Sequence, residues 1–368
     1  MKHTISDYRT IFLENKPLID VRSPGEFSKG SFPTASNLPL LLDEERAAVG
    51  LCYKRYGQEA AIDLGYKLVK GSVREERLAA WVRFARHHPE GYVYCFRGGL
   101  RSSITQGWLS DLGVNYPLVT GGYKAMRRFL IDSLEHALKN MKIVLVSGRT
   151  GVGKTRVVSN LDKGIDLEGL AKHRGSTFGR LLEAQPSQIN FENALSIEVI
   201  RSFNSSNGLL FLEDEGKLIG RISLPNCLRK IMSKAPMISV EASLSERVEI
   251  VLQDYVVDLG QSYQHLYGAA GADLHRDRLL DDLLRIRRRL GDEQQKHVAQ
   301  IIINAFEKHR SEGCFELHRQ WIKELLQSYY DPMYDYQLSQ REGQCIMSGS
   351  RSEVIAWAED YSCCFGRK

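Results

Sequence analysis

Two stretches of this chain contain residue types that do chemistry. Cys95 stands in YVYCFRGGLRSS, directly after a short apolar run. The second stretch, GRTGVGKT, covers residues 148–155 and follows another apolar run. A cysteine thiolate is a nucleophile, and a glycine-rich loop that ends in Lys-Thr binds phosphate groups. We therefore expect the chain to combine sulfur or selenium chemistry with the binding of a phosphate or diphosphate.

The second stretch matches the phosphate-loop pattern G-x-x-x-x-G-K-[ST] at every fixed position, between an expected strand and an expected helix. Backbone amides in such a loop converge on anionic oxygens, the lysine adds positive charge, and the threonine can hold Mg²⁺. A chance glycine-rich turn is the alternative. The predicted phosphate-binding residues are Gly148, Gly151, Val152, Gly153, Lys154 and Thr155. The acids expected to organise Mg²⁺, each with a helix cap or a surface position as its alternative, are Asp166, Glu213 and Asp214.

The residues that follow Cys95 favour a reactive thiolate. Gly98 and Gly99 let backbone amides curl toward the sulfur, and a helix is expected to begin just beyond them. Arg97 and Arg101 add positive charge. A buried structural cysteine is the alternative, and the other six cysteines lack such surroundings. Cys95, Arg97 and Arg101 are therefore the predicted catalytic residues.

Composition places the chain among ordinary globular proteins. It has 368 residues, 43% hydrophobic and 26% charged, with a formal net charge of +5. No apolar run reaches membrane-spanning length and the first residues are polar, which predicts a cytoplasmic protein without a membrane partner. The seven cysteines contain no CxxC pair and are expected to be reduced thiols without a zinc site.

Short apolar runs alternate with helical periodicity over most of the chain, which predicts parallel α/β sheets. Strands are expected at 18–21, 92–94, 118–120, 143–146, 209–212 and 237–240. Helices are expected at 75–86, 102–112, 123–140 and 155–161. Beyond about residue 247 the pattern becomes almost wholly helical.

Three segments of the first third resemble a rhodanese domain: PLIDVRSPGEFSKGSFPTASNLP (17–39), the cysteine loop CFRGGLRS, and LVTGGYKA. Residues 30–35 read GSFPTA where that family has Gly-His-Ile-Pro-Gly-Ala, and the cysteine loop has one extra glycine. The longer loop argues against thiosulfate as the natural donor.

Over its full length the chain is similar to the tRNA 2-selenouridine synthase family. The supporting stretches are 165–180, 185–193, 211–225, 245–256 and 285–291. The resemblance implies an enzyme that replaces the sulfur of wobble 2-thiouridine in tRNA by selenium from selenophosphate. It also implies an S-geranyl-2-thiouridine intermediate made from geranyl diphosphate, and no tightly bound cofactor apart from a candidate Mg²⁺. Implied partners are tRNA and a selenophosphate-producing enzyme, with a monomer as the expected state.

This resemblance gives four expected regions. They are a rhodanese-like parallel-sheet domain (1–128), a linker helix (129–140), a P-loop NTPase-like α/β domain (141–260) and a helical C-terminal region (261–368).

Roles follow from combining the motifs with the resemblance. Lys154 and the loop amides are expected to neutralise the departing diphosphate. Cys95 is expected to take selenium as a perselenide, while Arg97 and Arg101 hold the departing phosphate or the anionic adduct. Phe178, Leu181 and Phe191 are candidate contacts for the prenyl tail.

RNA binding is predicted from basic residues. Arg285, Arg288 and Arg289 share one face of an expected helix, and Arg174 lies in a His-Arg-Gly-Ser segment. A solvated helix face paired with neighbouring aspartates is the alternative. Two other functions stay open: a sulfurtransferase coupled to a nucleotide-hydrolysing phosphate loop, and a regulator that uses the loop as a nucleotide switch.

Overall fold

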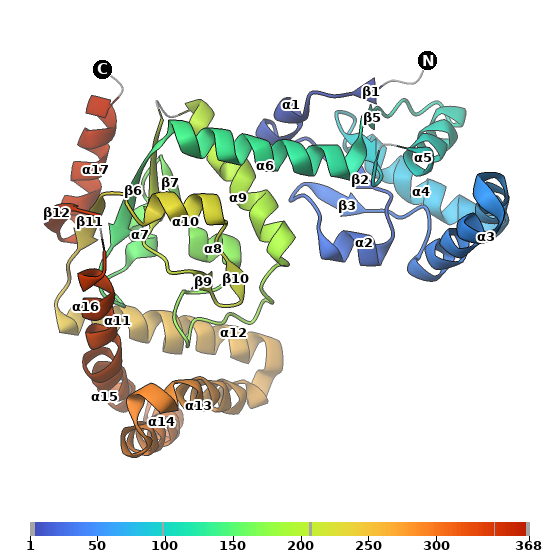
Figure 1. Cartoon of the computed structure of the whole chain (residues 1–368). Coiled ribbons are helices and arrows are strands. Elements are labelled where there is room, and N and C mark those ends of the chain that lie inside the picture. Colours follow the sequence, from blue (N-terminus) through green and yellow to red (C-terminus); the bar gives the residue numbers. More distant parts are fainter. Residues whose placement is uncertain (1–3, 98, 206–207, 342, 366–368) are drawn as a thin grey trace. The chain divides into compact units, whose positions relative to one another are not determined.

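A computed structural model describes residues 4–97, 99–205, 208–341 and 343–365 (Figure 1). Gly98 of the cysteine loop lies outside the described residues. The chain forms two units, one of residues 1–137 and 187–201, the other of residues 138–186 and 202–368. Residues 187–201 fall inside the region expected as the P-loop domain, yet they pack with the N-terminal unit.

The first unit is built on a five-stranded parallel sheet in the order β1-β5-β4-β2-β3. Its strands are β1 (Thr4–Ile5), β2 (Leu18–Asp20), β3 (Ala35–Asn37), β4 (Tyr92–Tyr94) and β5 (Leu118–Val119). In a parallel sheet all carboxyl ends meet at one edge, and loops at that edge commonly form binding sites. Cys95 follows β4 directly and therefore lies at this edge.

Helices surround this sheet. They are α1 (Tyr8–Leu13), α2 (Pro24–Lys29), α3 (Asp43–Leu68), α4 (Gly71–His87), α5 (Leu100–Asp111) and α6 (Gly122–Asn140). The left-handed φ of +88° at Gly57 divides α3 into two arms, which glycine tolerates because it lacks a Cβ. The core on one side contains Trp81, Trp108 and Leu109, packed against β2 and β4.

The helix α9 (Gln188–Ser205) completes the first unit from far along the sequence. Its Ile197 and Ile200 join the buried cluster around Phe12 and Met126. Asn193 donates a hydrogen bond to the Ser31 carbonyl at 2.7 Å. This pairing was not predicted, since nothing local in the sequence marks which sheet an amphipathic helix covers.

The second unit also has a five-stranded parallel sheet, in the order β12-β11-β6-β8-β7. The strands are β6 (Lys142–Ser147), β7 (Gly164–Ile165), β8 (Leu209–Glu213), β11 (Met237–Val240) and β12 (Cys345–Gly349), and an antiparallel pair consists of β9 (Leu218–Ile219) and β10 (Ile222–Ser223). The region 261–368, expected to be helical, also contributes the strand β12, which pairs with β11 and was not predicted. Its short run CIMSG carries too weak a pattern to distinguish a sheet edge from a loop.

Helices of the second unit divide into those beside the sheet and a C-terminal group. The first are α7 (Lys154–Ser159), α8 (Leu167–Ala171), α10 (Asn226–Met232) and α17 (Arg351–Phe365). The group is α11 (Leu244–Leu252), α12 (Asp258–Tyr267), α13 (Gly271–Leu290), α14 (Asp292–Glu312), α15 (Glu316–Leu325) and α16 (Asp331–Ser339), with π-helical turns at Gln253–Val257 and Leu326–Tyr330 and a 3₁₀ turn at Gly268–Ala270. Leu279, Ile302, Trp321 and Leu325 are buried in its shared core, so the prediction of a helical C-terminal part beyond the α/β sheets is confirmed.

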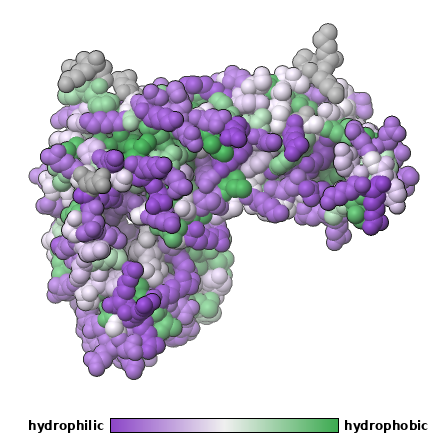
Figure 2. Space-filling model, viewed as in Figure 1, coloured by the Kyte–Doolittle hydropathy of each residue, from purple (hydrophilic) through white to green (hydrophobic). Residues whose placement is uncertain are grey.

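Hydrophilic residues cover most of the visible face, with apolar residues between them (Figure 2). Within the described residues, no helix is both long and apolar enough to span a lipid bilayer.

Candidate functional site

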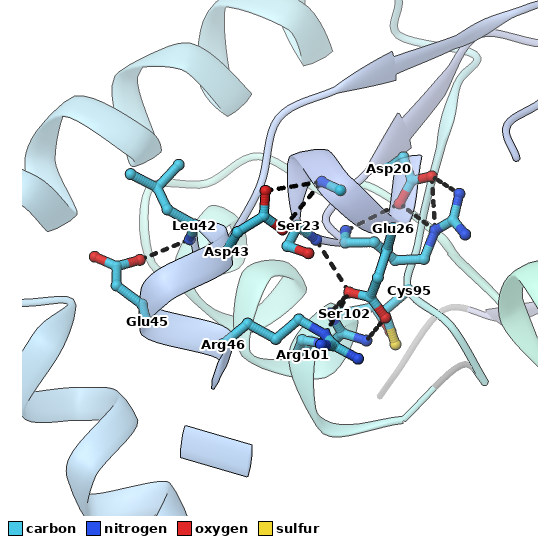
Figure 3. Close-up of polar contacts among 12 residues, drawn as sticks. Asp20, Ser23, Glu26, Leu42, Asp43, Glu45, Arg46, Cys95, Arg101 and Ser102 are labelled. Carbon is cyan, nitrogen blue, oxygen red and sulfur yellow. Dashed lines mark hydrogen bonds and ion pairs between the residues drawn. The ribbon is translucent and has the colours of Figure 1, made fainter. Parts of the chain in front are cut away.

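The sulfur of Cys95 is held at the carboxyl edge of the first sheet. Only 3% of the surface of Cys95 is exposed to solvent. The backbone N–H of Gly99 donates to Sγ at 3.3 Å. The Ser102 hydroxyl lies 3.2 Å from the same sulfur and can donate to it (Figure 3). Both donors belong to the start of α5, so the loop does turn polar hydrogens toward the sulfur. Such donors stabilise a thiolate more than a thiol.

The two loop arginines take different positions. Arg101 forms an ion pair with Glu26 at 2.6 Å, and Arg46 reaches the same carboxylate at 3.1 Å (Figure 3). Arg97 is exposed and lies over the ring of Phe96, with 5.8 Å between the guanidinium carbon and the ring centroid. Within the part of the loop that the structure describes, the two guanidinium groups thus contact Glu26 and Phe96 rather than the Cys95 sulfur.

Glu26 is the central acid of this cluster. Burial by itself would raise its pKa, but the hydrogen bond and charge of Arg101 lower it to about 2. Its carboxylate also accepts the backbone N–H of Ser23 at 3.1 Å, which fixes the start of α2. Glu26 is thus ionised at neutral pH and anchors both arginines beside the cysteine loop.

Asp20 and Arg22 form a buried ion pair that supports the same edge. Asp20 ends β2, and its carboxylate accepts the Arg22 guanidinium at 2.6 Å. Arg22 also donates to the Gly30 carbonyl at 2.7 Å and lies over the Tyr123 ring at 3.9 Å. The Asp-Val-Arg sequence therefore has a structural role, since it ties the loop after β2 to its neighbours.

The phosphate loop lies between β6 and α7, as its motif requires. Gly148, Gly151 and Gly153 have φ values of +143°, +85° and +85°. A Cβ on Gly148 would approach the Val240 carbonyl oxygen to 2.6 Å, so the close backbone packing needs glycine there. Lys154 Nζ donates to the Gly148 carbonyl at 3.0 Å and thus closes over the loop.

A buried arginine fixes this loop from outside. Arg247 on α11 donates to the Thr150 carbonyl at 2.9 Å and pairs with Asp331 on α16 at 2.5 Å. Arg149 of the loop pairs with Asp335 at 2.9 Å. The helical C-terminal part therefore helps to position the phosphate loop.

Three glutamates lie next to Lys154 and Thr155. Thr155 Oγ1 donates to Glu168 at 3.2 Å, and the Glu168 backbone N–H donates to Glu213 at 3.0 Å. Burial, and then the charge of Glu215, raises the pKa of Glu168 to about 8. Burial and the charge of Glu168 raise the pKa of Glu213 to about 8, and burial, opposed by Lys154, raises that of Glu215 to about 7.

The predicted acids have separate positions in this arrangement. Asp166 caps α8 and accepts the Gly169 N–H at 2.6 Å. Asp214 accepts the Ser147 hydroxyl at 2.6 Å and pairs with Arg341. Of the three acids, Glu213 fits best the predicted role of organising Mg²⁺, because it ends β8 and is fully buried.

Sequence reasoning missed two of the glutamates, although both stand beside acids that it selected. Glu168 lies two residues after Asp166, and Glu215 is the last acid of the Glu-Asp-Glu run that ends β8.

Mg²⁺ was an expected ligand here. Among the residues that the structure describes, no group of three or more His, Cys, Asp or Glu side chains is arranged to hold a metal. Mg²⁺, however, is usually held by one or two carboxylates together with oxygens of a phosphorylated substrate. The Thr155 hydroxyl fits that pattern beside Glu168, and so does Glu213, whose Oε1 is buried without a hydrogen-bond partner.

A cavity of about 850 Å³ opens over the phosphate loop. Lys154, Thr155 and Glu168 line one part of it. Aromatic and aliphatic side chains line another part, among them Leu181, Val251, Tyr255, Met333 and Tyr334, and further polar side chains, including Asp254 and Arg341, complete the lining. Of the candidate prenyl contacts, Leu181 lines this cavity, Phe178 is buried in the helical core, and Phe191 is buried in the first unit. The tyrosines were missed, although the segment YYDPMYDY is conspicuously aromatic.

The predicted RNA-binding arginines are placed on α13 and near the phosphate loop. Arg285, Arg288 and Arg289 are exposed on α13. Arg174 lines the loop cavity and pairs with Asp254 at 3.1 Å.

The alternative to RNA binding was that these arginines pair with neighbouring aspartates of α13, and such pairing is weak. Asp282 is buried and pairs with Arg180 and Arg278, while Arg285 lies 3.9 Å from it.

A parallel α/β unit with a complete phosphate loop, joined to a second parallel α/β unit with a hydrogen-bonded thiol, is typical of an enzyme that handles phosphorylated substrates. Residues 141–364 match a family model described as the tRNA 2-selenouridine synthase AAA domain. The chain belongs to the tRNA 2-selenouridine synthase family of enzymes, as its sequence predicted.

Full-length relatives agree with this assignment. Three proteins described as tRNA 2-selenouridine synthase come from Marinobacter nauticus (49% identical over 96% of both chains), Alcanivorax borkumensis (50% over 97% of this chain and 99% of the other) and Pseudomonas fluorescens Pf0-1 (48% over 97% and 98%). A crystal structure of the N-terminal domain of an ATP/GTP-binding protein from Clostridium difficile 630 is 33% identical over 35% of this chain and 98% of that chain; its TM-score of 0.31 supports no conclusion about fold.

Proposed function

We propose that this chain is a tRNA 2-selenouridine synthase, which replaces the sulfur of wobble 2-thiouridine in tRNA by selenium from selenophosphate. The observation that carries the proposal is an intact phosphate loop and a hydrogen-bonded Cys95 in one chain that is 49% identical to a tRNA 2-selenouridine synthase over nearly its full length. The proposal treats the first unit as a rhodanese-like domain and the second as a P-loop domain. We also propose that the enzyme is cytoplasmic and monomeric, and that a selenophosphate-producing enzyme supplies its selenium donor.

The first chemical step activates the sulfur as a leaving group. The thiocarbonyl sulfur attacks C1 of geranyl diphosphate, the carbon–oxygen bond breaks, and diphosphate leaves. The N3 proton is lost, which gives neutral S-geranyl-2-thiouridine. A thioether sulfur then departs far more readily than a thiocarbonyl sulfur.

The phosphate-loop cavity supports this step. Lys154 and the loop amides stabilise the negative charge that grows on the diphosphate. The same cavity has an apolar and aromatic wall, including Leu181, Val251 and Met333, which suits a prenyl chain. Mg²⁺, if bound, would be held by Thr155 and Glu213 and would neutralise diphosphate charge.

The second step delivers selenium, and electron counting restricts how Cys95 takes part. Selenium in selenophosphate is already at the selenide level. A perselenide on Cys95 would oxidise it, so phosphorus would have to leave as phosphite. If the Cys95 thiolate attacks phosphorus instead, the phosphorus–selenium bond breaks, hydrogen selenide leaves, and hydrolysis of the S-phosphocysteine gives phosphate. We favour this redox-neutral route over the perselenide expected from the sequence.

Hydrogen selenide then adds to C2 of the geranylated base. The C2–S bond breaks, and the sulfur departs with a proton as geranylthiol, which leaves 2-selenouridine. Arg97 and Arg101 flank the cysteine loop and supply the charge for a phosphoryl group, although Arg101 is shared with Glu26. ³¹P NMR separates the routes, since the favoured route yields phosphate and the perselenide route yields phosphite.

The tRNA would contact the basic residues. Arg285, Arg288 and Arg289 form an exposed basic surface, and Arg174 lies in the phosphate-loop cavity. Arginine side chains bind phosphates without reading sequence, so this surface would orient the tRNA rather than select it.

The proposal is tested by mass spectrometry of tRNA nucleosides from cells that lack the gene for this protein. Loss of both 2-selenouridine and geranylated 2-thiouridine, with recovery of both on complementation, is the expected result. Unchanged levels of both nucleosides would contradict it. Nucleotide hydrolysis stimulated by tRNA, without either nucleoside change, would favour the alternative of a sulfurtransferase coupled to a nucleotide-hydrolysing module.

A further inference from the structure

The first unit contains a second large cavity, an open one that is lined by the two arms of α3 and by α5. Its volume is about 700 Å³, within the range of roughly 300–1,000 Å³ that is usual for small-molecule sites. The left-handed turn at Gly57 separates the arms of α3, and both arms line the cavity. Nothing in the chemistry assigned to the phosphate loop uses this space.

Most of the side chains that line the cavity are apolar, both inside it and at its opening. Leu41, Ala61 and Val69 form part of the buried wall. Leu51 and Tyr66, which also line it, are 50% and 48% exposed. Large apolar side chains left uncovered around a hollow mark a site for an apolar ligand.

The turn of helix that contacts the Cys95 sulfur also forms a wall of this cavity. Arg101, Ile104 and Trp108 line the cavity from one face of α5, since residues three, four and seven positions apart share a helix face. Ser102, the next residue after Arg101, donates to Cys95 Sγ at 3.2 Å. The first turns of α5 therefore contact the thiol through Ser102 and line the cavity through Arg101, Ile104 and Trp108.

The charged side chains that line the cavity are Arg46, Lys54 and Arg101, and two of them lie beside the cysteine loop. Arg46 and Arg101 line the cavity and both contact Glu26 (Figure 3). Two arginines share one carboxylate, so the end of the cavity beside that loop keeps a net positive charge. The site thus suits a ligand with a long apolar chain attached to a group that reacts beside an anionic donor such as selenophosphate.

We propose that this cavity binds the geranyl chain of S-geranyl-2-thiouridine while selenium replaces sulfur, and that it holds the departing geranylthiol. The inference rests on the proposed function. In the step it serves, hydrogen selenide adds to C2, the C2–S bond breaks, and the geranyl-bearing sulfur leaves with a proton, without any change in oxidation state. The phosphate-loop cavity would hold the same chain only in the earlier, diphosphate-releasing step.

Gly50 offers a direct test, because it lines the cavity within a helical part of α3. A Cβ built there meets no atom within 4 Å. Gly50→Leu would therefore fill part of the cavity, with a Cβ that meets no other atom, and leucine also has the higher helix propensity. Gly107→Leu is the matched control, since Gly107 is an exposed α5 residue with the same open space and does not line the cavity.

The experiment uses the full-length protein and two anticodon stem–loop RNAs, one with S-geranyl-2-thiouridine and one with S-methyl-2-thiouridine. Binding affinity and single-turnover conversion with selenophosphate are measured for each. We expect the wild-type protein and Gly107→Leu to prefer the geranyl RNA by at least tenfold, and Gly50→Leu to lose this preference. Geranylation of 2-thiouridine RNA should stay unchanged in Gly50→Leu.

The outcomes separate this inference from the proposed function. A wild-type protein that converts neither RNA contradicts the proposed function and the cavity assignment together. If the wild-type protein prefers the geranyl RNA and Gly50→Leu keeps that preference, the cavity assignment is overturned while the function stands. Circular dichroism checks folding, and Ala47→Phe, another α3 residue on the cavity wall, replaces Gly50→Leu if that variant unfolds.

Discussion

The hydroxyl of Ser102 donates a hydrogen bond to the sulfur of Cys95 at 3.2 Å. The two residues are seven positions apart, and the turn between β4 and α5 brings them together. The Gly99 N–H donates to the same sulfur at 3.3 Å, and the Ser102 hydroxyl also lies 3.0 Å from the Gly99 carbonyl oxygen, so Cys95 stands in a polar turn rather than among apolar side chains alone.

Ser102→Ala should make Cys95 less reactive. Loss of one hydrogen-bond donor destabilises the thiolate, so we expect alkylation of Cys95 by iodoacetamide at pH 7 to slow about tenfold, as expected for a charge-assisted bond of roughly 1.5 kcal/mol. Peptide mass spectrometry follows the reaction at this cysteine. Ser103→Ala, which alters the adjacent α5 residue, should react like the wild-type protein; equal slowing in both variants would contradict the assignment.

Glu26→Gln should destabilise the protein at neutral pH. The carboxyl pKa is lowered from 4.5 to about 2 in the folded state, so ionised Glu26 contributes up to about 3 kcal/mol above pH 4.5. That contribution is lost as the pH falls through the folded-state value. Urea unfolding should therefore show the full difference between variant and wild type at pH 7 and roughly half of it near pH 3. Glu44→Gln, an exposed α3 substitution, should match the wild type at both pH values.

Binding of geranyl diphosphate without metal should weaken as the pH rises. Glu168 and Glu213 have pKa values raised to about 8, and Glu215 to about 7, so all three become charged between pH 6 and pH 9. Their negative charge would repel the diphosphate beside Lys154. Calorimetry in EDTA should show at least a tenfold loss of affinity over this range.

Added Mg²⁺ should remove most of that pH dependence, and Glu213→Gln should reduce it. Affinity in EDTA that does not change between pH 6 and pH 9 would show that the three glutamates do not face the ligand.

Substitution of Arg285, Arg288 and Arg289 by alanine should weaken tRNA binding and its salt dependence. Each lost phosphate contact lowers the slope of log affinity against log salt by about 0.9, so the slope should fall by about three at most. Filter binding at several salt concentrations measures it. Arg310→Ala, on α14 and paired with Asp273, is the control; an equal loss in both variants would point to overall charge rather than to this surface.

Much of the sheet architecture was predictable, because short apolar strands bounded by turn residues have a strong local signal. The strands at 92–94 and 237–240 lie where the sequence placed them, and the helix expected at 75–86 is the centre of α4. The phosphate loop was also predictable, since its glycines and lysine act within eight consecutive residues.

The remaining features depend on contacts between distant residues. No pattern near Arg101 indicates that its guanidinium would pair with Glu26, 75 residues earlier. The packing of α9 on the first unit and the addition of β12 to the second sheet depend on tertiary contacts that local periodicity does not encode. The apolar cavity beside α5 also requires the turn at Gly57. A lone glycine in a helical segment permits a left-handed conformation, but the sequence alone does not show that the glycine adopts it.

Nucleoside mass spectrometry of tRNA treated with purified variants tests most directly whether geranylation and selenation are divided between Lys154 and Cys95 within one chain. Cys95→Ala, supplied with 2-thiouridine tRNA, geranyl diphosphate and selenophosphate, should accumulate the S-geranyl nucleoside and form no 2-selenouridine. Lys154→Ala should form little of either from 2-thiouridine tRNA, yet convert tRNA that is already geranylated. Formation of 2-selenouridine by Cys95→Ala at the wild-type rate would contradict the account.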